Sequence, residues 1–585
     1  MIKTLLSQVK EFKKASFLTP VFMILEVVVE TIIPVAMARM IDNGVEKGNM
    51  SYIYRVGAVM AVLAIAGLIA GFLGGKYGAL ASSGFARNLR KAMYTNIQTF
   101  SFSNIDKFST AGLITRLTTD VTNLQNAYQM ILRMCTRAPA SLICAMTMAF
   151  LINARLASVY LIAVIFLGFA LVMILRRATR YFQEVFKKYD DLNASVQENI
   201  SGIRVVKAYV REDYETSKFQ KACNKVYEMF VRAEKLVVMN MPLMQFTVYA
   251  CILCISWLGA KMIVGSSLTT GELMSLLTYC MNILMSLMML SMVFVMVTMS
   301  MASAERVTEV INEKADLSNP AQPVVEVPDG RIDFDHVSFR YKKEGKENVL
   351  KDINLSIHAG ETIGIIGGTG SAKSSLVNLI SRLYDVSEGS VKVGGIDVRN
   401  YDMEVLRNQV AVVLQKNVLF SGTILENLRW GNKEATEEEC ERACQLACAD
   451  EFIQRMPDGY HTYIEQGGTN VSGGQKQRLC IARALLKKPK ILILDDSTSA
   501  VDTATDAKIR KAFAEEIPDT TKLIIAQRIS SIQSADRIIV MEDGRINGFG
   551  THEELLENNP IYQEVYHSQT KAGGDFDENR GGEQA

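Results

Sequence analysis

The chain lacks three features that would place it in common classes of protein. Its ten cysteines show no framework of paired spacings, so we expect reduced thiols rather than a disulfide scaffold. The apolar stretch near the N-terminus is not followed by a small-residue cleavage site, which favours a retained membrane span over a secretory signal peptide. The formal net charge is only +1, so the composition gives no support for a nucleic-acid partner.

Hydrophobic residues, in contrast, are abundant. They make up 49% of the 585 residues, which is too apolar for an ordinary soluble enzyme. Six apolar segments, each near the roughly twenty residues that a bilayer requires, lie close to 16–38, 56–80, 128–152, 156–176, 240–264 and 273–300. The sequence therefore predicts an all-α membrane domain of six transmembrane helices.

The connections between these spans differ in length and charge. Those after the second and fourth spans are long and basic, with Arg87 and Arg90 in one and Arg176 and Arg177 in the other. The positive-inside rule places both long loops, and both ends of the domain, in the cytoplasm. Helical periodicity without proline persists through residues 180–235 and is interrupted by a single glycine, Gly202, so the helices are expected to continue beyond the membrane.

Two pairs of charged residues lie within the predicted spans. Glu26 and Glu30 are one helical turn apart in the first span, and Arg133 and Arg137 are one turn apart in the third. Charges at this depth are unfavourable unless they are paired or hydrated, which makes Glu26 and Glu30 candidates for contact with a substrate. The alternative is that the acidic and basic pairs bind each other and stabilise the helix packing.

The last span is rich in methionine. Flexible thioethers suit a surface that adapts to varied apolar ligands, although plain packing against lipid or neighbouring helices is the alternative. The methionines concerned are Met285, Met288, Met289, Met292, Met296 and Met299.

A glycine-rich stretch between residues 363 and 376 joins an apolar strand to an apolar helix. Such a loop turns backbone N–H groups toward a polyphosphate, its lysine adds positive charge, and its hydroxyl can hold Mg²⁺. The pattern G-x-x-x-x-G-K-[ST] is nearly met, but its second glycine is Ala372. The residues expected to contact ATP here are Gly367, Gly368, Thr369, Gly370, Ser371, Ala372, Lys373, Ser374 and Ser375.

Strand and helix patterns alternate from residue 331 to 568 and predict an α/β domain. Its sheet should be partly parallel, with the phosphate loop at the C-terminal end of a strand. The continuous apolar run over residues 491–494 ends in Asp495 and Asp496. This pattern is typical of a buried central strand that delivers carboxylates to Mg²⁺ and to water.

The segment VSGGQKQR at residues 471–478 resembles the signature of ATP-binding-cassette (ABC) proteins. Together with the six preceding spans, it makes nearly the whole chain resemble a bacterial ABC exporter half-transporter with its membrane domain first. The resemblance implies a transport ATPase in the bacterial inner membrane, with a cytoplasmic nucleotide domain and with ATP and Mg²⁺ as cofactors.

The resemblance also assigns roles to single residues. Tyr341 resembles the aromatic residue that stacks on adenine, and Gln415 the glutamine that links Mg²⁺ to the membrane domain. The implied Mg²⁺ ligands are Ser374, Gln415 and Asp495. The segment 499–502 resembles the loop that crosses the dimer, and the segment beginning at Glu465 resembles the one that contacts the membrane-domain loops in exporters.

The signature residues Ser472, Gly473, Gly474 and Gln475 open a helix whose N-terminus would face the γ-phosphate of ATP held by another subunit. One chain holds only one such domain. Two chains are therefore needed, and the expected partner is a second ABC half-transporter.

Two residues depart from the family pattern. The position after the Mg²⁺-binding aspartate is normally Glu, which positions the attacking water, and here it is the shorter Asp496. The histidine expected near the γ-phosphate is Gln527, which can donate a hydrogen bond but cannot take up a proton. Phosphoryl transfer depends on accurate placement of water and charge. The site built on this chain's phosphate loop has Asp496 and Gln527 in the catalytic positions. We therefore expect this site to hydrolyse ATP weakly.

The pattern favours one half of a heterodimeric multidrug-type exporter that moves an amphipathic or hydrophobic substrate across the membrane. A homodimeric exporter with slow hydrolysis and an ATP-dependent membrane sensor are the alternatives, and the substrate could be a drug, a lipid or a peptide. The expected domains are a transmembrane domain at 1–310, a linker at 311–330, a nucleotide-binding domain at 331–568 and a disordered tail at 569–585.

Overall fold

The computed structural model describes residues 1–341, 347–496 and 501–577, and its contacts divide the chain into two compact units. The helical unit contains residues 1–99 and 109–313. The α/β unit contains residues 100–108 and the chain from residue 314 onward. A short piece of the first cytoplasmic loop thus belongs to the α/β unit.

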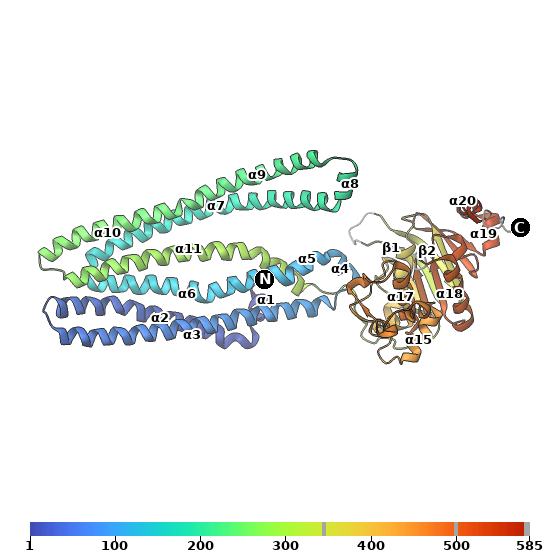
Figure 1. Cartoon of the computed structure of the whole chain (residues 1–585), viewed down its shortest axis with the longest axis horizontal. Helices are drawn as coiled ribbons and strands as arrows, with labels where there is room; N and C mark the ends of the chain where they lie inside the picture. The colour runs from blue at the N-terminus through green and yellow to red at the C-terminus, as the bar shows by residue number, and fades with distance from the viewer. Residues whose placement is uncertain (342–346, 497–500, 578–585) are drawn as a thin grey trace. The chain divides into compact units, whose positions relative to one another are not determined.

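The helical unit consists of long helices joined by short turns (Figure 1). Within the described residues, six helical stretches are long and apolar enough to cross a membrane, as the sequence predicts. The elements are α1 (Ile2–Ser7), η1 (Lys10–Phe12), α2 (Lys13–Met40), η2 (Ile41–Val45), α3 (Met50–Ile97), α5 (Thr110–Thr115), η3 (Arg116–Asp120), α6 (Val121–Ile152), α7 (Ala154–Ser201), α8 (Ile203–Ala208), α9 (Glu212–Val238), α10 (Asn240–Val264) and α11 (Thr270–Asn312).

Helices α2 and α3 pack antiparallel through a row of glycines on α3. Small residues let two membrane helices approach closely, so that dispersion contacts replace contacts with lipid. A Cβ added at Gly71 would lie 2.9 Å from the Glu26 carboxylate, and one added at Gly78 would lie 3.3 Å from the Thr19 methyl group. Larger side chains at these positions would force the two helices apart.

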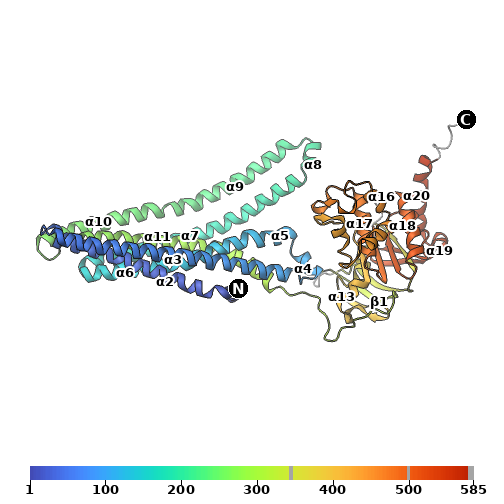
Figure 2. The same ribbon diagram turned by 60° about the horizontal axis from the view of Figure 1, so that its bottom comes forward.

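The cytoplasmic extensions form a long helical hairpin. Helix α7 runs without a break from Ala154 to Ser201, and Gly202 follows at its C-cap, where the sequence periodicity is interrupted. Helix α9 returns beside α7, as both views show (Figures 1 and 2). The short helix α8 forms the turn at the tip.

Among its described residues, the α/β unit contains three sheets. Its strands are β1 (Ile332–Phe339), β2 (Leu350–Ile357), β3 (Thr362–Gly367), β4 (Glu388–Val393), β5 (Ile396–Asp397), β6 (Val410–Val413), β7 (Gly422–Thr423), β8 (Tyr463–Ile464), β9 (Ile491–Asp495), β10 (Thr521–Ile525), β11 (Arg537–Glu542) and β12 (Arg545–Gly550). Its helices are α4 (Phe102–Lys107), α12 (Lys373–Ile380), η4 (Val398–Asn400), α13 (Met403–Gln409), α14 (Ile424–Leu428), α15 (Glu437–Leu446), α16 (Asp450–Ile453), η5 (Gly459–His461), η6 (Gln466–Gly468), α17 (Gly473–Leu485), α18 (Thr503–Glu516), η7 (Ile529–Ser531), α19 (His552–Asn558) and α20 (Pro560–Asp577).

The largest sheet has the strand order β12-β11-β3-β10-β9-β6, and all but β12 run parallel to their neighbours. Ile525 of β10 lies opposite both Ile365 of β3 and Asp495 of β9. In such a sheet the loops that follow neighbouring strands emerge at one edge, where ligands bind. The predicted α/β P-loop fold is therefore confirmed, and the strand order decides which loops meet.

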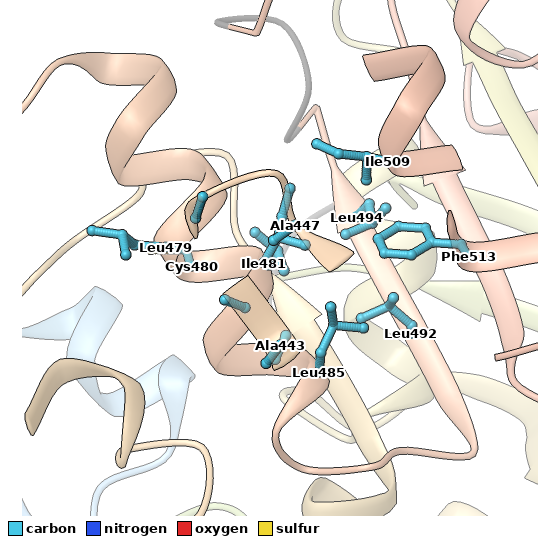
Figure 3. Packing of buried hydrophobic residues seen from close by; sticks show 14 of the residues in the cluster. Ala443, Ala447, Leu479, Cys480, Ile481, Leu485, Leu492, Leu494, Ile509 and Phe513 are labelled. Atoms are coloured by element: carbon cyan, nitrogen blue, oxygen red, sulfur yellow. The ribbon is translucent and has the colours of Figure 1, made fainter. Parts of the chain in front are cut away.

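Helix α17 is held against this sheet by a closely packed hydrophobic core (Figure 3). Ile481 and Leu485 of α17 meet Leu492 of β9 and, across the strand, Phe513 of α18. All four are almost fully buried. Burial of a side chain of this size contributes about 1.5–3 kcal/mol, so α17 is a rigid support for the residues at its N-terminus.

The C-terminal helix α20 starts at Pro560 and is anchored by Tyr562, whose side chain is fully buried. Helical backbone continues to Asp577, past residue 569, where the sequence predicts the start of a disordered tail. An anchored first turn removes the unfavourable nucleation step, so each following residue can add a hydrogen bond. Residues 578–585 lie outside the described part of the chain.

Candidate functional site

Four loops meet at the C-terminal edge of the large sheet. The phosphate loop follows β3, Gln527 follows β10, Asp496 follows β9 and Gln415 follows β6, and these four strands are consecutive neighbours in the order β3-β10-β9-β6. Residues that are more than a hundred positions apart in the sequence are thereby brought to one site. The sheet topology, not the local sequence, produces this gathering.

The phosphate loop begins at Gly367, the last residue of β3, and ends where Lys373 starts α12. The ammonium group of Lys373 donates to the carbonyl oxygens of Gly367 and Gly368 at 2.9 and 2.8 Å. Burial lowers the pKa of Lys373, and the carboxylates of Asp495 and Asp496 partly oppose this shift. The lysine therefore lies at the rim of the loop, within reach of an anion that enters it.

Ala372 lies in the left-handed backbone region, with φ at +71° and ψ at 25°, directly before α12. Glycine accepts this conformation freely, whereas a Cβ costs about 1–2 kcal/mol there. Alanine in place of the second glycine of the phosphate-loop pattern therefore introduces backbone strain at the N-terminus of α12. The backbone N–H groups of the loop are retained.

Asp495 is buried at the end of β9 and accepts a hydrogen bond from the Ser374 hydroxyl at 3.0 Å. Burial is the main cause of the raised pKa of Asp495, which the hydrogen bond from Ser374 partly offsets. Hydroxyl and carboxylate oxygens are ligands that Mg²⁺ prefers. The chemistry of Ser374 and Asp495 therefore fits a Mg²⁺ ion, and the amide oxygen of Gln415 adds a further oxygen donor at the same edge of the sheet.

Asp496 joins the two glutamines of the site. Its Oδ2 atom accepts a hydrogen bond from Gln527 at 2.7 Å and a longer one from Gln415 at 3.3 Å. The backbone of Asp496 is also in the left-handed region, with φ at +49°. The two departures from the family pattern at the catalytic positions, Asp496 and Gln527, are therefore in direct contact.

Tyr341 follows β1, and its hydroxyl lies 2.8 Å from the Ser375 hydroxyl in the first turn of α12. Its ring packs edge-on against Tyr384 at 5.1 Å and is 43% exposed, so part of the ring remains available for stacking. Tyr384 in turn donates to Asp106 of α4 at 2.7 Å. The sequence does not mark Tyr384 as a site residue, because a tyrosine after a helix carries no distinguishing pattern.

The signature residues lie at the N-terminus of α17, which is a different helix from the one that follows the phosphate loop. Ser472 caps the helix, with its hydroxyl accepting from the Gln475 N–H at 3.3 Å while the Gln475 side chain accepts from the Ser472 N–H at 2.9 Å. Among the described residues, no hydrogen bond joins Ser472–Gln475 to the phosphate loop. The exposed first turn at Gly473 keeps N–H groups that a helix cannot satisfy internally.

The segment 499–502 is only partly described. Ser499 and Ala500 lie outside the described residues. Asp502 caps α18 by accepting from the Thr505 N–H at 2.9 Å.

In the helical unit, Arg137 of α6 binds both intramembrane glutamates of α2. Its guanidinium donates to Glu26 at 2.7 Å and to the two carboxylate oxygens of Glu30 at 2.9 and 3.0 Å. The Glu26 side chain is 14% exposed and that of Glu30 is 47% exposed. One residue of the basic pair, Arg137, thus binds both members of the acidic pair, and Glu30 retains an accessible carboxylate edge.

Comparisons with known proteins cover both units. Residues 16–307 match the family described as the ABC transporter transmembrane region, and residues 350–499 match the ABC transporter family. The uncharacterised ABC transporter ATP-binding protein YfiB of Bacillus subtilis is 37% identical over 564 residues, covering 96% of this chain and 98% of YfiB. The ATP-dependent lipid A-core flippase of Desulfotalea psychrophila is 34% identical over 488 residues, covering 83% and 84% of the two chains.

The fold is similar to a solved bacterial Atm1-family ABC exporter with ATP bound. The TM-score is 0.80 at 23% identity, over 95% of this chain and 98% of the other. With six membrane helices and an ATP-binding domain in one polypeptide, the chain is a multi-pass membrane protein with a cytoplasmic ATPase domain. The chain belongs to the ABC transporter family, as a half-transporter with the exporter fold and the activity of a transport ATPase.

Proposed function

We propose that this chain is one subunit of a heterodimeric ABC exporter, in which its own phosphate loop forms a weakly hydrolysing ATP site and its signature helix completes the active site of a different partner chain. The observation that carries this proposal is the contact of Asp496 with Gln527 at 2.7 Å. This pair occupies the positions at which the family pattern has Glu and His.

The residues of the site are suited to binding ATP. The N–H groups of the loop 368–372 and the ammonium group of Lys373 would hold the phosphates, and the exposed part of the Tyr341 ring would stack on adenine. Mg²⁺, held by Ser374, Gln415 and Asp495, would supply positive charge that offsets the charge of the phosphates.

The same residues are poorly suited to hydrolysis. The carboxylate of Asp496 is one methylene shorter than that of Glu, and it is already bonded to the Gln527 amide. That amide donates hydrogen bonds but does not take up a proton near neutral pH, so it cannot act as a base or carry positive charge. Misplacement of an attacking water by about 1 Å can cost on the order of a hundredfold in rate, so occupancy without efficient turnover is expected.

The signature helix, in contrast, presents an ordered N-terminus suited to bind an anion. Its N-terminus is capped by Ser472 and rigidly supported by the core beneath α17, and the first turn at Gly473 and Gly474 is accessible. A helix N-terminus of this kind binds an anion through free N–H groups and the helix dipole. The partner's γ-phosphate is the proposed ligand.

The tip of the α7–α9 hairpin supports the need for a second chain. Tyr209, Val210 and Tyr214 are exposed there, Val210 to 81%. Apolar side chains in a cluster on a cytoplasmic surface indicate a contact site. We propose that this tip docks on the partner's nucleotide domain, and a cysteine placed at Glu212 should then cross-link to the partner. Cross-links confined to one chain would contradict this crossover.

The proposed substrate is amphipathic or hydrophobic. In α11 the methionines Met285, Met292 and Met299, spaced at seven residues, are all exposed and form one stripe along the helix. The accessible edge of Glu30 adds a polar contact. Glu30→Gln should raise the KM for transport of a cationic amphiphile into vesicles with little change in maximal rate, whereas an equal loss for all substrates would indicate a purely structural glutamate.

The decisive experiment compares the chain alone with the chain co-purified with its partner. We expect weak Mg²⁺-dependent ATPase activity from the chain alone and strong activity from the pair. Robust activity of the chain alone would favour a homodimeric exporter that uses Asp496 as the base. Strong ATPase activity of the pair without transport in inverted vesicles would favour a membrane sensor.

A further inference from the structure

The C-terminal helix α20 is bonded to the loop that carries Gln527. The side-chain amide of Gln569 accepts a hydrogen bond from the Ile529 N–H at 2.8 Å and donates one to the Gln527 carbonyl oxygen, also at 2.8 Å. One side chain thus holds the backbone on both sides of Arg528. An amide suits this task because it presents one donor and one acceptor group side by side.

Gln569 is carried by a helix that is itself well anchored. Tyr562, two turns earlier, is fully buried, and its hydroxyl lies 2.7 Å from His552 of α19. Val565 and Tyr566 pack against the hydrophobic core of the α/β unit. The position of Gln569 is therefore fixed by packing, which allows it to position the loop that it contacts.

The loop is held on its other side by α18. The Ser531 hydroxyl donates to the buried carboxylate of Asp506 at 3.0 Å. The Gln527 side chain then extends from the held loop to Asp496 at 2.7 Å. A cavity of about 470 Å³ lies between the phosphate loop, at Gly368 and Thr369, and the residues of α20 around Gln569.

We infer that Gln569 is a positioning residue for nucleotide binding: it holds the backbone of the Gln527 loop so that the Gln527 amide points into the site at the place of the γ-phosphate. The inference rests on the proposed ATP site and on the expectation from the family pattern that Gln527 lies near the γ-phosphate. It assigns to α20, which sequence reasoning placed partly in a disordered tail, a part in distinguishing ATP from ADP.

The test uses the purified full-length chain in lipid nanodiscs and measures the affinities for ATP and ADP by displacement of trinitrophenyl-ATP. Gln569→Met keeps the length of the side chain but removes both hydrogen bonds, and it should lower the ratio of ATP to ADP affinity about fivefold. Gln569→Glu keeps the acceptor for Ile529 but places a carboxylate oxygen against the Gln527 carbonyl oxygen, so it should lower the ratio at least as much as Gln569→Met.

A matched control is available on the same helix. Gln563 donates to the carbonyl oxygens of Leu556 and Glu557 at the end of α19, so Gln563→Met loosens the docking of α20 without touching the Gln527 loop. It should leave the ATP to ADP ratio unchanged. Equal changes in the ratio for Gln563→Met and Gln569→Met would show that α20 acts only through stability, which would overturn the inference.

Gln527→Ala distinguishes the positioning role of Gln569 from the expected contact of Gln527 with the γ-phosphate. A lowered ratio for Gln527→Ala combined with an unchanged ratio for Gln569→Met would overturn the positioning role and leave Gln527 as a γ-phosphate contact. Unchanged ratios for both variants would instead remove the proposed role of Gln527. A lowered ratio for both, with the control unchanged, is the expected result.

Discussion

The α/β unit has two helices whose N-termini are suited to hold a phosphate, and the two differ in how they are built. Helix α12 starts after Ala372, a strained left-handed residue that provides no side-chain cap. Helix α17 starts after Ser472, which forms a complete capping box with Gln475. Both helices keep the backbone N–H groups of an anion site, but only α17 has a side-chain cap.

The surroundings of the two helices differ in the polar groups beside them and not in packing, since Leu376 and Val377 of α12 are as buried as Ile481 of α17. At α12, the neighbouring catalytic positions hold Asp496 and Gln527, which bind each other. At α17, the hydrophobic core beneath the helix is intact and almost fully buried. If the signature of this chain completes the ATP site of a partner, the N-terminus of α17 must stay ordered. Loss of hydrolysis at the site beside α12 is then tolerated as long as nucleotide still binds there. Four substitutions test this asymmetry.

The largest effect is expected from the signature. In the heterodimer, Gly474→Glu places bulk and negative charge at the N-terminus of α17, where the partner's γ-phosphate should lie, and it should lower steady-state ATPase activity about a hundredfold or more. The matched change Gly368→Glu places the same carboxylate in this chain's phosphate loop, where a Cβ meets no atom within 4 Å. It should lower turnover much less, and equal losses would remove the asymmetry.

The next effect concerns nucleotide binding. Lys373→Ala removes the ammonium group at the rim of the phosphate loop and should weaken ATP binding at this chain's site about ten- to hundredfold, since hydrogen bonds to charged groups contribute about 1.5–3 kcal/mol. Transport by the heterodimer should be only partly reduced. Filter binding of labelled ATP measures the affinity, and uptake into vesicles measures transport. Lys392→Ala is the control, because the Lys392 ammonium group pairs with Asp335 at 3.4 Å in another sheet. Complete loss of transport with unchanged ATP binding would contradict the division of labour.

A smaller gain is expected from removing the backbone strain. Ala372→Gly replaces a strained left-handed alanine and should raise ATP affinity about threefold, because part of the about 1–2 kcal/mol of strain at this position is released in the loop. The same substitution in the regular helix α18, Ala514→Gly, should instead lower the free energy of unfolding by about 0.5–1 kcal/mol. Thermal denaturation and ATP titration of both variants check the opposite signs, and a loss of affinity for Ala372→Gly would show that the methyl group is not a source of strain.

The smallest effect is expected at the catalytic position. Asp496→Asn removes the charge of a poorly placed base from a site that is already slow, so ATPase activity of the heterodimer should fall about threefold at most, which corresponds to less than about 1 kcal/mol of transition-state stabilisation. Steady-state rates measured beside Gly474→Glu decide the point. If Asp496→Asn lowers turnover as deeply as Gly474→Glu does, the site on this chain is catalytic and the homodimeric exporter becomes the better description.

Local pattern was sufficient for much of the fold. The apolar runs predicted six membrane helices because a bilayer demands a fixed length of apolar helix, and the break at Gly202 was visible as an interruption of the helical period. The order of strands in the large sheet could not be predicted in this way, because each pairing depends on residues far apart in the sequence. The same holds for the ion pair of Arg137 with Glu26 and Glu30, which the sequence suggested only as one of two alternatives.

The sequence by itself determined the family and the identity of nearly every group that would meet ATP, because the phosphate loop, the acidic strand end and the signature are each contiguous in the chain. Only the tertiary structure decided how these groups are used. It placed Gln527 on Asp496, put the methyl group of Ala372 in a left-handed backbone position and bonded Gln569 of the C-terminal helix to the Gln527 loop. The physical reason is that contacts between distant residues and backbone angles arise from packing of the whole sheet, whereas residue type and spacing are fixed locally.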